Sequence, residues 1–117
     1  MNKRQELLLD LLELKRPIKE IAAALSTYPW DSDSELVLLT PGGISEILRR
    51  YVDGNVTAGD VEHWANAIEG RDDIGIKPGA TRAILHELAN PVLTQPLTPS
   101  RATVLFAMLS HDLADQQ

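Results

Sequence analysis

The sequence predicts an all-α fold, a compact bundle or orthogonal array of about five to six short helices forming a single domain over residues 1–117. Three observations lead to this prediction. Apolar residues recur at helical spacing in six segments, helix-start signals precede several of these segments, and each apolar stripe covers only one face. Because such a helix must bury its apolar face, the segments are expected to pack against one another.

Two helices are expected near the N-terminus, over residues 2–15 and 17–27. Leucines one turn apart mark the inner face of the first, and Ile21 and Leu25 mark that of the second. Pro17 separates them, because proline is tolerated in the first turn of a helix but not in its interior. One long helix kinked at Pro17 is the alternative.

Two further helices begin at threonine caps. Thr40 precedes a proline at the first helical position, and this helix is expected to end at Asp53. Thr57 caps the next helix, with Asp60 in the capping-box position, and Gly70 supplies its left-handed stop. The apolar stripe of this second helix contains Trp64, which is therefore expected in the core.

Two more helices are expected towards the C-terminus, over residues 80–90 and from Thr98-Pro99 to about Asp115. The first of them ends where Asn90 meets Pro91, since the residue before a proline is restricted to extended conformations. Residues 71–79 between the helices are expected to form a loop rich in charge and glycine.

The apolar run 35–39 is the one short segment that periodicity leaves unassigned. No partner strand is evident in the rest of the chain, and a lone strand is not stable. The run is therefore expected to be an extended segment that packs on helices, or an edge that pairs with a second copy in a dimer.

Composition narrows the class of protein. The chain has no cysteine, which excludes disulfides and thiolate sites and favours a cytoplasmic location. No apolar stretch approaches the length of a membrane span, and charged residues interrupt the apolar cluster near the N-terminus, so no membrane association is expected. The net charge of −6 disfavours nucleic-acid binding because the surface repels phosphate backbones.

Motifs that carry chemistry are incomplete. In His86-Glu87-Leu88-Ala89-Asn90, asparagine stands where a zinc-binding helix needs its second histidine, and Glu87 is expected to face water. The glycines after Thr40 lack the lysine of a phosphate loop. The pair of Asp60 and His63 has no second copy to complete a metal site. We therefore expect no metal, no cofactor and no enzymatic activity.

Two stretches are candidates for binding a protein. Tyr28 and Trp30 flank a proline beside Asp31 and Asp33, and large aromatic residues near the surface are favoured in interfaces. The alternative for Trp30 is that it covers the end of the helical core.

The second stretch is Arg71-Asp72-Asp73, which lies between two glycines directly after a helix. Both aspartates are expected to contact a cationic partner, so changing both to asparagine should slow association with little loss of stability. Arg71 either offers its guanidinium to a partner carboxylate or pairs with one of its own acids and fixes the loop.

The segments Tyr51-Val-Asp-Gly-Asn-Val-Thr57, Val61-Glu-His-Trp-Ala-Asn66 and Glu69-Gly-Arg-Asp-Asp-Ile-Gly75 resemble a family of small uncharacterised bacterial proteins, and Glu87-Leu-Ala-Asn-Pro91 extends the likeness. That family is compared with colicin-type immunity proteins. The resemblance implies a bacterial source and a binding role rather than catalysis, and it carries over no inhibitory residue.

Two functional hypotheses follow. The first is a protein-binding domain, an immunity or antitoxin-like inhibitor of a basic toxin, because acidic inhibitors gain association rate from charge complementarity. The second is a structural or adaptor subunit that forms a homo-oligomer, with Val37–Leu39 and the Tyr28–Trp30 loop as contact surfaces. A monomer or a homodimer is compatible with the sequence.

Overall fold

The computed structural model describes residues 2–114, and the side chains of residues 2–111. The described part confirms the predicted fold class, since it is mostly helical with two short strands. Its elements in chain order are α1 (Lys3–Glu13), α2 (Ile18–Leu25), β1 (Val37–Leu39), α3 (Pro41–Val52), α4 (Ala58–Ile68), β2 (Ile74–Ile76), α5 (Ala80–Ala89) and α6 (Pro99–Ala114). Asp115, the expected end of the last helix, lies outside the described residues.

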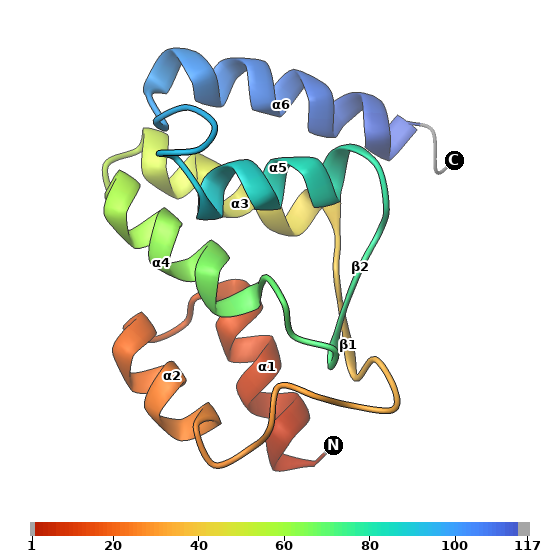
Figure 1. The fold of residues 1–117 in the computed structure, drawn as a ribbon. Coiled ribbons are helices and arrows are strands. Elements are labelled where there is room, and N and C mark those ends of the chain that lie inside the picture. Colours follow the sequence, from red (N-terminus) through yellow and green to blue (C-terminus); the bar gives the residue numbers. More distant parts are fainter. Residues whose placement is uncertain (1, 115–117) are drawn as a thin grey trace.

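The helices occupy two ends of the molecule (Figure 1). Helices α3, α5 and α6 pack at one end, α1 and α2 pack together at the other, and α4 contacts both groups. The two strands run along one side and link the ends (Figure 1). The segment that follows α4 lies against α1, where Asp73 pairs with Arg4.

The predicted caps are present. The side chains of Thr40 and Thr57 accept hydrogen bonds from the third residue of their helices, and Asp60 completes the second cap as a capping box. Gly70 ends α4 with φ of +93°. Helices α1 and α2 are separate, since Leu14 leaves the helical conformation with φ of +47° and Pro17 then caps α2.

The expectation that residues 35–39 lack a partner strand is wrong. β1 pairs in parallel with β2, with Val37 opposite Ile74 and Leu39 opposite Ile76. The expected loop 71–79 therefore contains a strand. Periodicity did not find it because three residues are too few for a pattern, and because α3 and α4 separate the two strands along the chain.

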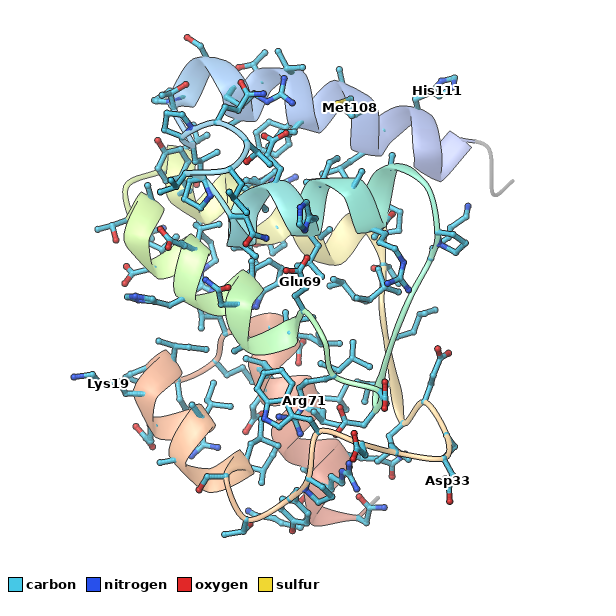
Figure 2. All side chains as sticks on the ribbon, viewed as in Figure 1. Lys19, Asp33, Glu69, Arg71, Met108 and His111 are labelled. Atoms are coloured by element: carbon cyan, nitrogen blue, oxygen red, sulfur yellow. The ribbon has the colours of Figure 1, made fainter. Side chains whose placement is uncertain are left out.

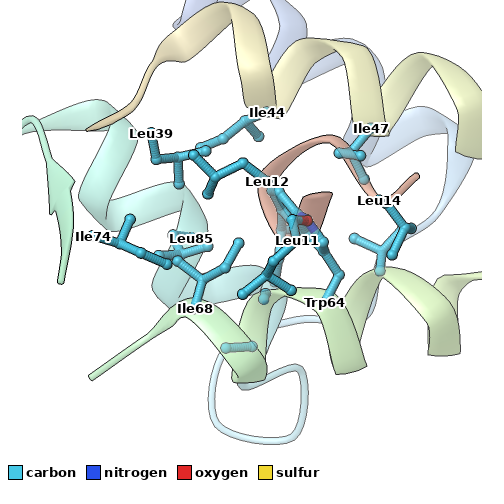
Figure 3. Close-up of a cluster of buried hydrophobic side chains, with 14 of the residues drawn as sticks. Leu11, Leu12, Leu14, Leu39, Ile44, Ile47, Trp64, Ile68, Ile74 and Leu85 are labelled. Atoms are coloured by element: carbon cyan, nitrogen blue, oxygen red, sulfur yellow. The ribbon is translucent and has the colours of Figure 1, made fainter. Parts of the chain in front are cut away.

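One apolar core contains side chains from all six helices and both strands of the described chain. Trp64 is fully buried in it, as predicted, and its Nε1 donates a hydrogen bond to the Leu11 carbonyl oxygen at 2.8 Å. Figure 3 shows Trp64 of α4 beside Leu11 of α1. This bond ties α4 to the α1–α2 end, where the residues predicted to bind a partner lie.

Candidate protein-binding site

A buried ion network lies beneath the site. The Arg71 guanidinium donates from Nε to Asp73 Oδ1 at 2.9 Å and from Nη2 to Asp73 Oδ2 at 3.0 Å. Arg4 donates from Nε to Asp73 Oδ2 at 3.1 Å, so that one carboxylate holds two guanidinium groups. The side chains of Asp73 and Arg71 are 0% and 4% exposed. Bidentate pairing of this kind is both strong and directional.

The pKa of Asp73 reflects two opposing effects. Burial raises the pKa, because removal from water disfavours the charged carboxylate. Hydrogen bonds from Arg71 and Arg4, and the charges of both guanidinium groups, act in the opposite direction and together outweigh burial. The pKa of Asp73 therefore lies below its ordinary value, and the carboxylate is ionised at neutral pH.

The network joins three segments that are far apart in the sequence. Arg4 Nη2 also donates to the carbonyl oxygens of Pro29 at 2.9 Å and Asp31 at 3.1 Å. The amide of Asp72 donates to the Trp30 carbonyl oxygen at 3.0 Å. The start of α1, the loop after α2 and the segment after α4 are thereby fixed relative to one another.

Trp30 lies on top of this network. The Arg71 guanidinium carbon is 5.0 Å from the centroid of the indole ring, a cation–π distance. The ring also lies against Gly70, whose missing Cβ would be 3.8 Å from it. Trp30 nevertheless stays 47% exposed, so that one part of the ring is held by the protein and the rest is open to solvent.

Acidic residues occur in both segments that meet at Trp30, since Asp31 and Asp33 follow it in the chain and the Asp72 amide donates to its carbonyl oxygen. Asp31, Asp33 and Asp72 are exposed, and no described residue forms an ion pair with any of them. Figure 2 shows Arg71 between α4 and the α1–α2 end, and Asp33 at the outer edge of the preceding loop. Tyr28 is partly buried against the core, with the Arg4 guanidinium carbon 5.8 Å from its ring centroid. We name the surface formed by Trp30, Asp31, Asp33 and Asp72, with the partly exposed Tyr28 beside it, the Trp30 face.

A small hollow opens beside the indole ring. Its volume is about 130 Å³, and one wall is formed by Trp30 and Arg71. The other lining residues come from α1, α2 and α4, and they are Leu11, Ala22, Leu25, Ser26 and Ala67. Apart from the guanidinium and one hydroxyl, these side chains are apolar, so the hollow suits the end of one aliphatic side chain.

The structure brings most of the predicted residues together and corrects two of them. Arg71 is not free for a partner carboxylate, because it pairs with Asp73 and fixes the loop. Asp73 is fully buried, so it cannot contact an external cation. Because its carboxylate is buried and paired with two guanidinium groups, we now expect a change at Asp73 to lower the stability of the fold.

Arg4 was missed by the sequence analysis. A signal for it exists, since Arg4 stands one turn before Leu8 and two turns before Leu11, on the inward face of α1. A cation at the end of an apolar stripe indicates a buried partner for its charge. That partner, Asp73, is 69 residues further along the chain.

Other residues singled out in the sequence have structural roles. Glu87 does not face water, because it accepts two hydrogen bonds from Arg101 of α6, at 2.9 and 2.7 Å. His86 and Asn90 both contact Glu69 at the end of α4, at 3.0 and 3.1 Å. Thr40 caps its own helix by accepting a hydrogen bond from the Gly43 amide.

No protein-family model matches the chain, and neither a curated protein nor a solved structure does. The helices of the described part are too short or too polar for any of them to cross a membrane. The proposed function therefore rests on the geometry of the Trp30 face and on the sequence.

Proposed function

We propose that this chain is a protein-binding domain whose Trp30 face binds a basic protein, in the manner of a bacterial immunity protein or antitoxin that inhibits a basic toxin. One observation carries the proposal. The indole ring of Trp30 is half-exposed and held by Arg71 and Gly70, and the exposed Asp31, Asp33 and Asp72 of the adjoining segments have no ion-pair partners among the described residues.

Each part of this arrangement suits binding. Tryptophan is enriched among the residues that dominate interface energies, above all where it stands beside a hollow that a partner can fill. The buried network holds the ring in place before binding, which lowers the entropic cost of association. The exposed carboxylates attract a basic surface and raise the association rate. The net charge of −6 adds to this attraction over a longer range.

The test starts with the tagged protein as bait in extract of its source cells at low salt. We expect a basic protein to be retained in stoichiometric amount and then to bind the purified chain. Trp30→Ala should raise the dissociation rate about thirtyfold or more, since interface tryptophans often contribute about 2 kcal/mol. Val92→Ala is the matched control, because Val92 is an exposed apolar residue on the loop after α5.

The contribution of charge needs a separate comparison. The triple change Asp31→Asn, Asp33→Asn and Asp72→Asn should lower the association rate about tenfold at low salt, with a smaller effect at high salt. Its control is a second triple change with the same net charge, made at the exposed residues Glu13, Glu46 and Asp53. An equal loss in both triple variants would show unspecific attraction and would refute the proposed site.

A second candidate function is a subunit that self-associates through α6. The exposed described residues of this helix include no Lys, Arg, Asp or Glu, and among them Val104 and Met108 are apolar. Figure 2 shows Met108 and His111 on the outer side of the helix, and Val104 stands one turn before Met108. A mass that rises with protein concentration, and returns to that of a monomer in Val104→Glu, would favour this function. A constant monomeric mass would exclude it.

A further inference from the structure

A pocket of about 390 Å³ lies on the side of the molecule where the α1–α2 turn meets the end of α3. Its volume is within the range of pockets that hold small molecules. The walls consist of the turn residues Leu14, Lys15, Arg16, Pro17 and Ile18, together with Arg50, Val56 and Asp60. Four of these residues are apolar and three carry a positive charge, a marked excess of cations for a chain with net charge −6.

Arg50 is the cation that α3 contributes to this pocket. Its Nη1 donates to the carbonyl oxygens of Glu13 at 3.0 Å and Leu14 at 3.3 Å, which holds the guanidinium at the end of α1. Among the described residues, no carboxylate forms an ion pair with Arg50. A guanidinium group carries five N–H donors, so others remain for a ligand in the pocket.

The carboxylates near the pocket already form ion pairs or hydrogen bonds within the protein. Arg16 pairs with Asp10 and Glu20, and the exposed Lys15 pairs with Glu13. Arg16 and Lys15 line the pocket, but these three carboxylates do not. Asp60, the one carboxylate in the lining, accepts a hydrogen bond from the Thr57 amide at 2.8 Å as part of the α4 cap.

The turn itself adds to the positive potential. Pro17 is the cap of α2 and makes no side-chain capping hydrogen bond, so the first amides of α2 are left for solvent or a ligand. Leu14 is held at φ of +47°, a conformation rare for a residue with a side chain, and this bend places Lys15 and Arg16 at the pocket wall.

We propose that this pocket binds a small organic anion with a carboxylate or phosphate head and an apolar body. The head pairs with the free donors of Arg50, because the guanidinium fork matches the spacing of carboxylate and phosphate oxygens. The body lies against Leu14, Pro17, Ile18 and Val56. The site is separate from the Trp30 face and does not depend on the proposed function.

The test is an amide NMR titration of the full chain at low salt, with octanoate, phenyl phosphate, inorganic phosphate and octanol as probes. We expect saturable shifts at the amides of Lys15, Arg16 and Ile18 with octanoate or phenyl phosphate, at dissociation constants in the range of about 0.1–10 mM. Octanol, which lacks the charge, should bind at least about tenfold more weakly. The comparison of octanoate with octanol tests the anionic head, and that of phenyl phosphate with inorganic phosphate tests the apolar body.

Variants connect the shifts to Arg50. Arg50→Met keeps the aliphatic stem and should weaken binding about tenfold, the effect of losing one charge-assisted hydrogen bond. Arg49→Met is the matched control, because Arg49 is 63% exposed, pairs with Glu46 and does not line the pocket. Lys15→Gln, at an exposed position, should weaken binding about threefold and serves if Arg50→Met does not fold.

Several outcomes would overturn the proposal. Absence of concentration-dependent shifts at these amides up to roughly 10 mM octanoate and phenyl phosphate would mean that the pocket takes no small organic anion. Equal effects of Arg49→Met and Arg50→Met, or of Arg49→Met and Lys15→Gln, would indicate unspecific charge attraction. If inorganic phosphate binds as tightly as phenyl phosphate, an apolar body does not contribute to binding. If octanol binds as tightly as octanoate, an anionic head does not contribute.

Discussion

Adjacent residues of this chain differ sharply in their environment. Asp72 is exposed and Asp73 is fully buried, although the two are chemically identical neighbours. Both residues lie in the turn between α4 and β2, and this turn directs one side chain to the surface and the next into the interior. Asp72 therefore belongs to the surface around Trp30, while Asp73 points inwards to Arg71 and Arg4.

We predict that Asp73→Asn lowers the free energy of unfolding by about 3–5 kcal/mol at pH 7, because it leaves two guanidinium groups without their buried counter-charge. Asp72→Asn, the control one residue earlier, should change it by no more than about 0.5 kcal/mol. Urea unfolding followed by far-UV circular dichroism measures both. Similar small effects in the two variants would show that the buried network contributes little to stability.

The same carboxylate makes stability depend on pH. Since the pKa of Asp73 in the folded protein lies below its ordinary value of 3.8, the folded state binds this proton less readily than the unfolded state. The stabilisation is complete above pH values near the ordinary pKa and is lost as the pH falls through the folded pKa. We therefore expect the difference in unfolding free energy between the wild type and Asp73→Asn to shrink below about pH 4. A difference that stays constant down to pH 2 would contradict this.

The helices and strands differ in how far local sequence determines them. A helix start depends on a few neighbouring residues, so Thr40 and Thr57 identified two starts correctly. The strands depend on each other across two intervening helices, and neither three-residue run carries a signal by itself. The end of α4 is local again, because Gly70 takes a positive φ that side chains disfavour.

We predict opposite effects for two glycine-to-alanine changes in and after α4. Gly70→Ala should cost about 1–2 kcal/mol, because a side chain is strained at φ of +93°. Gly59→Ala, in the first turn of α4, should stabilise by about 0.5–1 kcal/mol, since its Cβ would meet only Thr57 Oγ1 at 3.6 Å. Thermal and urea unfolding give both values, and a neutral Gly70→Ala would exclude the strain.

At the scale of the whole molecule, one core joins both ends. Buried side chains from α1 and α2 belong to the same cluster as those from α3, α5 and α6, with Trp64 of α4 among them. The ion network adds a second connection, from α1 to the segment before β2. The two ends are therefore expected to unfold together.

We predict a single cooperative unfolding transition. Trp64 emission, measured in Trp30→Phe so that only the core indole contributes, should follow the same urea curve as far-UV circular dichroism. The urea dependence of the unfolding free energy should be about 1–2 kcal/mol per molar, as for other small domains. Transitions that differ between the two probes would show that the α1–α2 end unfolds separately.

The sequence by itself determined the helical class, the helix starts and the position of Trp64 in the core. These features depend on periodicity and capping, which act over a few residues. Only the tertiary structure decided that β1 pairs with β2, that Arg4 reaches Asp73, and that Asp73 is buried while Asp72 is exposed. The physical reason is that parallel pairing and buried ion pairs join residues distant along the chain, and no local pattern specifies which distant residue will be the partner.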